Sequence, residues 1–259
     1  MFIRPRDIGS RPLFGPGTYY TYIAQTRGVS VEVYKVLPTA IGVFSRRWLA
    51  RLVESTHAQQ VEGHLKDIYR GAWQGSPIDI IPLSMGAPAA VATVEELGFC
   101  GLRNLITFGT AGGLEHDRPA GSVVIPIRAI REEGTSYHYL PPGDPAVPDA
   151  GVVDELRRSL TRHAIVWREG PTWTTDGLYR EFITKLADYR RDGCLTVEME
   201  CSAVFSACKT LNIRCAALLL VSDILSDEWR PAFVAEGLTA SLERTAPAVL
   251  DAAVALAVQ

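Results

Sequence analysis

An uninterrupted apolar stretch, Cys215–Val221, constrains the fold more than any other part of the chain. A strand that is apolar at every position is buried on both faces, which is typical of a largely parallel sheet covered by helices on both sides. Ser222 and Asp223 follow this stretch directly. The carboxyl end of such a strand is where α/β proteins place ligand-binding groups, so Asp223 is a candidate functional residue.

A second predicted strand ends in a pair of acids. The short apolar run Cys194–Val197 leads into Glu198 and Glu200, and a helix-compatible segment, residues 202–211, follows. Both carboxylates are therefore expected at a strand-to-helix junction, on the same rim of the sheet as Asp223. Acids in such positions are usually helix caps or turn residues, so spacing alone leaves structural and catalytic roles open.

The composition is that of an ordinary globular protein. Of the 259 residues, 47% are hydrophobic and 21% are charged, and the net charge is -3. Because no basic surface is expected, nucleic acid and membranes are poor candidates for a partner, and a small molecule is the better one. No apolar run is long enough to span a membrane, and the first residues lack the apolar core of a signal peptide, so we expect a cytoplasmic protein.

The five cysteines are odd in number and contain no C-x-x-C pair. We interpret them as small buried apolar residues rather than as disulfide partners. His138 has no partner His or Cys at the spacing of metal ligands, so we expect no metal site and favour a structural or pocket-wall role for this residue.

We divide the chain into an irregular N-terminal arm, residues 1–30, and one domain, residues 31–259. The arm is rich in Arg, Pro and Tyr without a clear period, and the remainder contains neither repeats nor linker-like tracts. The hydrophobic pattern of the domain predicts strands at 31–37, 78–83, 121–126, 194–197 and 215–221, a strand from 104 that runs into a glycine-rich turn by 114, helices at 45–56, 89–97, 152–163, 202–211 and 232–258, and a loop at 170–180.

Several short motifs occur in a fixed order along the chain: Arg70 with Gly75–Pro77, a strand and then Ser84–Pro88, next Thr107–Gly113, then Thr135–Pro142 and Thr174–Arg180, and finally Val197–Glu200 with Val221–Asp223. In this order they resemble the nucleoside phosphorylase and nucleosidase family, which includes purine nucleoside phosphorylase, uridine phosphorylase and methylthioadenosine/adenosylhomocysteine nucleosidase. The resemblance covers roughly residues 31–255. It implies an α/β fold, a three-layer α/β/α sandwich with a mixed, partly closed central sheet, and an enzyme that cleaves the N-glycosidic bond of a nucleoside.

The resemblance implies roles for the acids at the sheet rim. Glu200 would accept hydrogen bonds from the 2′- and 3′-hydroxyls of the sugar, with Glu198 beside it and Met199 as an apolar floor under the ring. Asp223 would donate a proton to N7 of the departing base, which favours a purine-like base. Asp223 and Glu200 are therefore the expected catalytic residues.

Base-contacting residues are expected in the segment that contains Trp173 and Asp176, because family members draw such residues from this loop. Trp173 offers a ring that can stack on a nucleobase, and Asp223 would complete the base site. A tryptophan in this position is equally well explained as a core residue. The sequence leaves both interpretations of Trp173 open.

An anion or water site is expected at Gly86 and Thr110, with Arg70 reaching the corresponding site of a neighbouring subunit. Thr107 stands where phosphorylases place their main phosphate-binding arginine, and residues 38–43 stand where the family has a Pro-Gly-Asp turn. Bidentate arginine is the best phosphate ligand, so its absence weakens phosphate binding.

We therefore expect water to be slightly favoured as the acceptor, so that free sugar is released. Phosphorolysis, which gives free base and a sugar 1-phosphate, is the alternative, and Arg46 or Arg47 would then have to bind phosphate from a different place. No cofactor is expected, apart from inorganic phosphate as a co-substrate in that alternative.

The resemblance implies two kinds of partner: a small-molecule nucleoside and further copies of the same chain. We expect a homo-oligomer, a dimer or a hexamer, with shared active sites. A non-catalytic nucleoside-binding protein with an eroded anion site is the alternative of another class. The presence of both Glu200 and Asp223 favours the enzyme.

Overall fold

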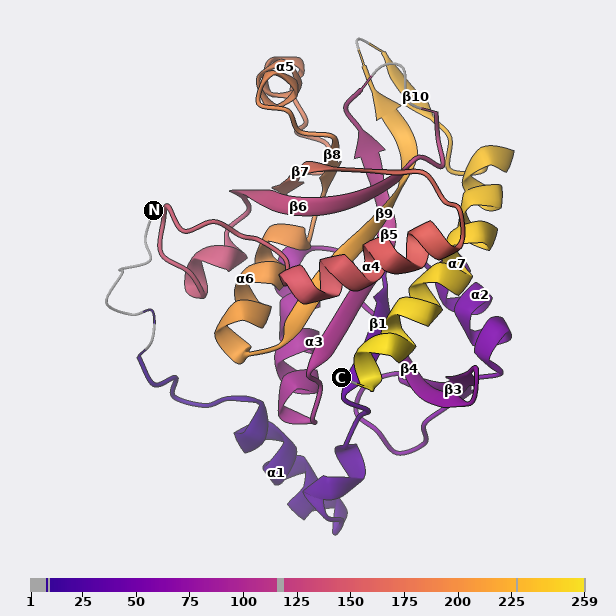
Figure 1. Ribbon diagram of the computed structural model, residues 1–259. Helices are drawn as coiled ribbons and strands as arrows, with labels where there is room; N and C mark the ends of the chain where they lie inside the picture. Colours follow the sequence, from indigo (N-terminus) through magenta and orange to yellow (C-terminus); the bar gives the residue numbers. More distant parts are fainter. Residues whose placement is uncertain (1–7, 9, 116–118, 227, 259) are drawn as a thin grey trace.

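The computed structural model describes residue 8 and residues 10–115, 119–226 and 228–258. One mixed sheet forms the middle layer, and helices cover both of its faces (Figure 1). The expected α/β/α architecture is confirmed. The expected strand around Cys215–Val221 is confirmed as well, and it is longer than the apolar run because it continues to Leu225.

The strands of the sheet are β1 (Thr39–Val43), β2 (Gln59–Gln60), β3 (Tyr69–Trp73), β4 (Ser76–Pro82), β5 (Asn104–Gly113), β6 (Val123–Glu132), β7 (Trp167–Thr175), β8 (Thr196–Glu198), β9 (Arg214–Leu225) and β10 (Trp229–Pro231). The α-helices are α1 (Pro16–Arg27), α2 (Arg46–Thr56), α3 (Ala87–Phe99), α4 (Ala150–Arg162), α5 (Ile183–Arg191), α6 (Cys201–Leu211) and α7 (Glu236–Ala257). Two 3₁₀ turns are η2 (Val31–Tyr34) and η3 (Thr135–His138).

The sheet is partly closed on itself, as expected. The strand order is β10-β9-β6-β7-β8-β5-β1-β4-β3-β2, and β5 pairs in addition with β9. The strands β5, β9, β6, β7 and β8 therefore form a ring of neighbours, from which the remaining strands extend. Within the ring, β5 is parallel to β9 and antiparallel to β8, so the sheet is mixed.

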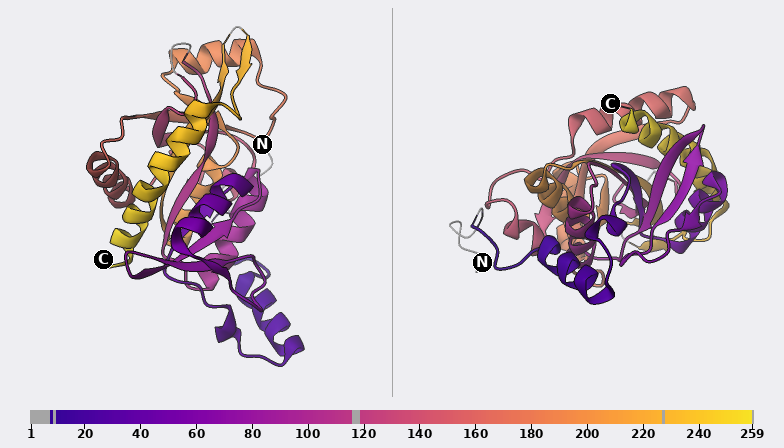
Figure 2. Two further views of the ribbon diagram at one scale, coloured as in Figure 1. Left: turned by 90° about the vertical axis from the view of Figure 1, so that its right-hand side faces the viewer. Right: turned by 90° about the horizontal axis from the view of Figure 1, so that it is seen from below.

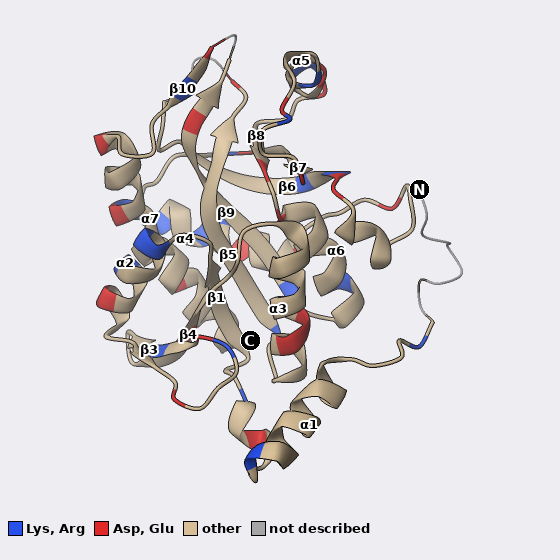
Figure 3. Cartoon of the chain, turned by 180° about the vertical axis from the view of Figure 1, so that it is seen from behind, with Lys and Arg blue, Asp and Glu red and all other residues tan. Residues whose placement is uncertain are grey.

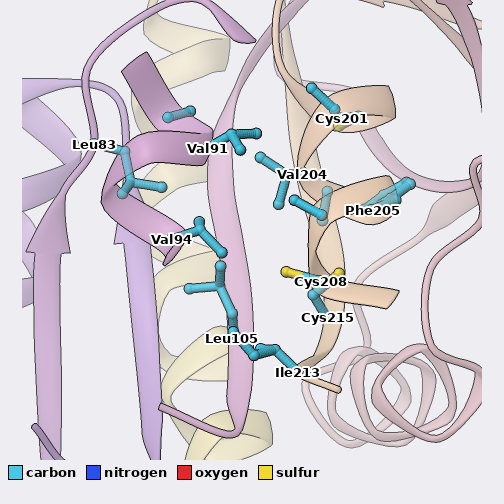
Figure 4. Close-up of a cluster of buried hydrophobic side chains, with 14 of the residues drawn as sticks. Leu83, Val91, Val94, Leu105, Cys201, Val204, Phe205, Cys208, Ile213 and Cys215 are labelled. Atoms are coloured by element: carbon cyan, nitrogen blue, oxygen red, sulfur yellow. The ribbon is translucent and has the colours of Figure 1, made fainter. Parts of the chain in front are cut away.

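Two separate cores explain the two helical layers. On one face, α3 and α6 pack against β5 and β9, and Figure 4 shows Val91 and Val94 of α3 meeting Val204 of α6 above Leu105 of β5. On the other face, α2, α4 and α7 cover the same strands with a second apolar cluster. Because β5 and β9 are covered on both sides, they are buried at nearly every position.

The N-terminal segment is not irregular throughout, as the sequence had suggested. Residues 16–27 form α1, which begins with Pro16 and ends at Gly28 in the left-handed conformation. Figure 2 shows α1 at one end of the molecule, where the buried Tyr20 packs against Phe99 and donates a hydrogen bond to Glu96 of α3. The helix has no apolar stripe, and a few aromatic contacts hold it in place instead. Residues 1–7 and 9 lie outside the described part of the chain.

The first strand of the sheet also differs from the sequence prediction. The segment predicted as a strand, residues 31–37, begins with the 3₁₀ turn η2, and the first strand is β1. The first strand-to-helix turn is therefore formed by Phe44 and Ser45, not by residues 38–43. The predicted helix after a serine cap is confirmed, because the Ser45 hydroxyl accepts a hydrogen bond from the Arg47 backbone N–H.

Two predicted irregular segments are strands. The glycine-rich stretch to Gly113 continues β5, and most of the predicted loop at 170–180 is β7. Glycine is required at Gly112 by close packing, since a Cβ atom there would lie 2.3 Å from Leu225 and 3.1 Å from Val197. The glycines thus mark close approach of strands rather than a turn.

Charged residues of both signs intermingle over the helices and loops in Figure 3. Among the described residues, no helix combines the length and the apolar character needed to cross a membrane. All five cysteines are buried and free, which confirms their interpretation as apolar residues.

The docking of α7 provides a stability test at Gly121. This residue has a φ of +88°, and a Cβ atom would lie 2.5 Å from the Gly237 carbonyl oxygen in the first turn of α7. Gly143 has a φ of +96° and open space around it, so it is a matched control. We expect Gly143→Ala to cost about 1–2 kcal/mol of backbone strain, and Gly121→Ala to cost about 1–3 kcal/mol more because α7 must shift.

Urea unfolding of the two variants measures this difference. Equal losses of unfolding free energy in Gly121→Ala and Gly143→Ala would show that α7 does not pack on Gly121 as closely as described.

Candidate functional site

A cavity of about 770 Å³ opens where β1, β5, β8 and β9 end. Its walls include the first strand-to-helix turn, the carboxyl halves of β5 and β9, the junction between β8 and α6, and the segment before α5. The three acids that the sequence placed on one rim of the sheet, Glu198, Glu200 and Asp223, all line this cavity. A cavity of this size at the carboxyl ends of strands is a typical small-molecule site.

Glu198 is held entirely by the protein. Its Oε1 accepts a hydrogen bond from the Thr174 hydroxyl at 2.6 Å, and its Oε2 accepts from the backbone N–H groups of Glu200 and Cys201 at 2.7 and 2.6 Å. The side chain therefore caps the start of α6 and positions Glu200. It also lines the cavity, so its expected contact with the sugar stays a prediction.

Glu200 is the residue that precedes α6, and its side chain reaches the loop before α3. Its Oε1 accepts a hydrogen bond from the Gly86 backbone N–H at 2.6 Å. Burial, together with the nearby Glu198 carboxylate, raises the pKa of Glu200 to about 8. A ligand that donates hydrogen bonds to this carboxyl group would favour its ionised form, because such bonds stabilise the charge.

Met199 and Thr110 lie in the wall around Glu200. Both side chains line the cavity, and Met85 lines it from the loop that also carries Gly86. The Gly86 N–H donates to Glu200 and is not free to bind an anion in this arrangement. Gly86 therefore positions this acid.

Asp223 lies at an irregularity in β9. The pairing of β5 with β9 shifts between Ala111 and Gly112, so that one extra residue, Ser222, is accommodated before Asp223. Its Oδ2 accepts a hydrogen bond from the Trp229 indole N–H at 2.8 Å, and its Oδ1 lies 2.8 Å from the Ser222 hydroxyl. Two side-chain hydrogen bonds therefore orient Asp223 in the wall of the cavity.

Glu181 is a fourth acid of this cavity, and the sequence analysis missed it. It follows the segment Leu178–Arg180 in the connection between β7 and α5 and lines the same wall as Asp223. Burial, together with the Asp223 charge, raises the pKa of Glu181 to about 7. The available signal was an acid directly after a motif expected to contact the ligand, but its proximity to Asp223 appears only in three dimensions.

The two residues expected to contact a base lie elsewhere. Trp173 is fully buried in a cluster with Val197 and Leu225 and stacks at 4.5 Å on Tyr189, so the interpretation as a core residue is right and base stacking is excluded in this arrangement. Asp176 is exposed, outside the cavity, and accepts a hydrogen bond from the Gly134 N–H at 3.0 Å. Trp173 lies in β7 and Asp176 directly follows this strand, whereas the first residue of this segment that lines the cavity is Leu178.

Arg70 does not reach the cavity of its own chain. It lies level with Asp79 of β4, Ala40 of β1 and Leu105 of β5, near the amino ends of β1 and β5, whereas the cavity lies at their carboxyl ends. Its guanidinium group binds both oxygens of the buried Asp79, at 2.7 and 2.9 Å. This ion pair orients the Arg70 side chain, which stays 38% exposed, so its expected approach to a neighbouring subunit remains a prediction.

No Arg or Lys of the described residues lines the cavity. Thr107, which stands in the position of the family arginine, lies in β5 and forms part of the wall. Ser45 lines the cavity at the start of α2, and the exposed Arg46 and Arg47 beside it do not. Arg47 donates to the Thr239 hydroxyl instead.

His138 is exposed and lies outside the cavity, so it does not form the pocket wall. Within the described part of the chain, no three His, Cys, Asp or Glu side chains are grouped in a way that could hold a metal ion.

Solved structures with the same fold are enzymes of nucleoside metabolism. Purine nucleoside phosphorylase from Toxoplasma gondii, in complex with immucillin-H, superposes with a TM-score of 0.81 at 25% identity, over 88% of this chain and 94% of that one. Uridine phosphorylase from Vibrio fischeri superposes with a TM-score of 0.75 at 22% identity, over 85% and 93% of the two chains. These likenesses confirm the fold.

Proteins with similar sequences include nucleoside phosphorylases as well. Guanosine phosphorylase of Halorubrum lacusprofundi is 30% identical over 154 residues, which are 60% of this chain and 64% of that protein. Uridine phosphorylase of Treponema pallidum is 33% identical over 183 residues, or 64% and 69% of the two proteins. The aligned region thus spans a little under two thirds of the first relative.

The family model of the phosphorylase superfamily matches residues 38–255, which include every strand of the sheet. The match covers far more than half of the chain and contains all the acids of the cavity. The protein therefore belongs to the phosphorylase superfamily.

Proposed function

We propose that this protein is an enzyme that cleaves the N-glycosidic bond of a purine-like nucleoside. The observation that carries the proposal is the presence of two separately anchored acids in one cavity: Glu200, fixed by Gly86, and Asp223, fixed by Trp229. Membership of the superfamily and the names of the relatives support the same chemistry.

Cleavage of the bond between C1′ and the base places positive charge on the sugar and negative charge on the departing base. Glu200, once ionised, accepts hydrogen bonds from the sugar hydroxyls and stabilises the positive charge. An acid at the other end, Asp223 or the neighbouring Glu181, provides the proton that the base needs in order to leave. An acid at the base end suits N7 of a purine, because that nitrogen accepts a proton.

Water is the acceptor that the cavity favours. A phosphate dianion requires several positive groups or N–H donors, yet no Arg or Lys of the described residues lines the cavity. The cavity contains Thr107 and Thr110 in their place, and the Gly86 N–H is already used by Glu200. Hydrolysis to free sugar therefore fits the walls better than phosphorolysis.

Phosphorolysis is the second candidate, and two observations favour it. The named relatives are phosphorylases. The amino end of α2 meets the cavity at Ser45, and the unpaired N–H groups of a helix start attract anions. An arginine from a second subunit would add the missing charge.

The acceptor is tested by base release from guanosine, inosine and adenosine in phosphate-free buffer, with identification of the sugar product. We expect release of base and free ribose without phosphate, and a rate that changes by less than about twofold on its addition. Strict phosphate dependence with a ribose 1-phosphate product would overturn hydrolysis. Tight binding without turnover of any nucleoside would overturn the enzyme and support a binding protein.

Glu200→Gln tests the sugar contact. The amide keeps the shape of the side chain but loses a charge-assisted hydrogen bond, which is worth about 1.5–3 kcal/mol, so we expect kcat/KM for a ribonucleoside to fall roughly ten- to a hundredfold. The 2′-deoxynucleoside should lose less, because one of the hydroxyls that binds Glu200 is absent. Equal losses for both substrates would show that Glu200 does not bind that hydroxyl.

We propose further that the chain forms a homo-oligomer that covers the mouth of the cavity, where Arg70 of one subunit approaches the site of another. Exposed apolar side chains support this, since Tyr179, Ile183, Trp229 and Phe233 line the cavity and yet remain open to solvent. Such a rim is typical of a surface that a partner covers.

Sedimentation velocity tests the assembly with two matched variants. Val234, next to the rim, is 92% exposed, and Val166, in the connection between α4 and β7, is 88% exposed. We expect the wild type to sediment as a dimer or larger, Val234→Lys to shift it towards monomer, and Val166→Lys to leave it unchanged. A fully active wild-type monomer would contradict the shared site.

A further inference from the structure

Glu181 is held at the cavity by the segment on either side of it. Before it, the Arg180 N–H bonds the Gly177 carbonyl at 2.7 Å, and the Gly177 N–H bonds the Thr175 hydroxyl at 3.2 Å, so the chain turns tightly after β7. After it, α5 is anchored by Arg190, whose guanidinium group donates to the Leu114 carbonyl at 2.6 Å. A carboxyl group fixed between two anchored segments is a built part of the cavity wall.

Glu181 and Asp223 differ in their hydrogen-bond partners. Asp223 accepts the Trp229 indole N–H, which can only donate, and its other oxygen meets the Ser222 hydroxyl. Glu181 receives no hydrogen bond from any other described residue, although it is half-buried in the same wall. Donors around a carboxyl group favour its ionised form, and burial without donors favours the neutral form.

The pair therefore divides into one group suited to carry charge and one suited to carry a proton. We propose that Glu181, rather than Asp223, donates the proton that the departing base receives, while Asp223 is the fixed negative neighbour that keeps this proton on Glu181. This inference rests on the proposed function, because it assigns the acid of that reaction. Consistently, burial and the Asp223 charge place the pKa of Glu181 at about 7, where a general acid is most effective.

The bond between C1′ and N9 breaks, and its electron pair passes to the purine ring. The proton on the Glu181 carboxyl group moves to N7, which leaves a neutral base and an ionised Glu181. Water or hydrogen phosphate adds to C1′ and releases one proton to solvent, and solvent returns one proton to Glu181 through the open cavity.

Other charged groups near Glu181 have to be separated from its effect. Asp223 acts on it from β9, Arg180 and the phenol of Tyr179 belong to its own exposed segment, and Arg230 lies on the exposed strand β10. Glu198 and Glu200 line the same cavity from the junction of β8 and α6. Since Glu200 also titrates, with a pKa of about 8, the pH dependence of a single substrate would mix two acids.

The experiment compares the purine riboside that wild type cleaves fastest with its N7-methylated counterpart, whose cationic base leaves without a proton. Every group that acts on the sugar affects both substrates equally. The ratio of kcat/KM for the unmethylated riboside to kcat/KM for the methylated one therefore reports on the group that protonates the departing base. In wild type we expect this ratio to fall about tenfold per pH unit above pH 7. The fall begins there because the acid must be protonated and its pKa is about 7.

Glu181→Gln should lower kcat/KM of the unmethylated riboside by about 10²–10⁴-fold and leave the methylated one within a fewfold of wild type. The ratio should then no longer depend on pH. In Asp223→Asn the fall should remain and begin at lower pH, because the negative neighbour is gone. Glu236→Gln, an exposed glutamate in the first turn of α7, should match wild type in every measurement.

Equal losses for both substrates in Glu181→Gln would show a merely structural role, and no loss would show that Glu181 does not supply the proton. Loss of the pH-dependent fall in Asp223→Asn, with the fall intact in Glu181→Gln, would return the role to Asp223. Each of these results leaves cleavage by wild type untouched, whereas failure of wild type to cleave any riboside would remove the proposed function itself.

Discussion

The pairing of β5 with β9 is the interaction on which the cavity depends. It runs from Asn104 opposite Arg214 to Gly113 opposite Ile224 and so joins two long strands at the centre of the molecule. The shift in this pairing at Gly112 accommodates Ser222 and presents Asp223 to the cavity. Without side chains at Gly112 and Gly113, the neighbouring Leu225, Val197 and Val221 can approach the strand closely enough to close the ring.

The cavity gathers acids in a place where charge is costly. Glu200 and Glu181 both have raised pKa values, because Glu200 is buried, Glu181 is half-buried, and each faces a second carboxylate. Burial of this kind does not stabilise a fold, since folding removes these groups from water without a cationic partner. Acids in such surroundings are typical of sites that move protons.

The sequence predicted the parts of the fold that depend on long hydrophobic patterns. The strand at Cys215–Val221, the helix after Ser45 and the junction at Glu198–Glu200 all occur as expected, because burial on one or both faces dictates their residue types. The helix α1 was missed because isolated aromatic contacts, chiefly Tyr20, hold it rather than an apolar stripe.

The site was predicted in part. Glu200 and Asp223 share one cavity because both follow strands that end at the same rim. Asp176 was expected at the base, and Trp173 either at the base or in the core, because the segment has the pattern of a loop. Instead, β7 buries the tryptophan, and the aspartate that follows β7 lies outside the cavity. Glu181 could not be identified from the sequence, because it lies in the connection after β7 whereas its neighbour Asp223 lies on β9. Their proximity depends on the ring of β5, β9, β6, β7 and β8.

The central claim is that one nucleoside spans this cavity from Glu200 to the acids around Asp223. A crystal structure with a bound C-nucleoside, in which carbon replaces the glycosidic nitrogen so that the bond cannot be cleaved, tests it most directly. The account predicts the 2′- and 3′-hydroxyls within hydrogen-bonding distance of Glu200 and the N7 edge of the purine facing Glu181 and Asp223. A sugar bound away from Glu200, or a base whose N7 edge faces away from both acids, would contradict it.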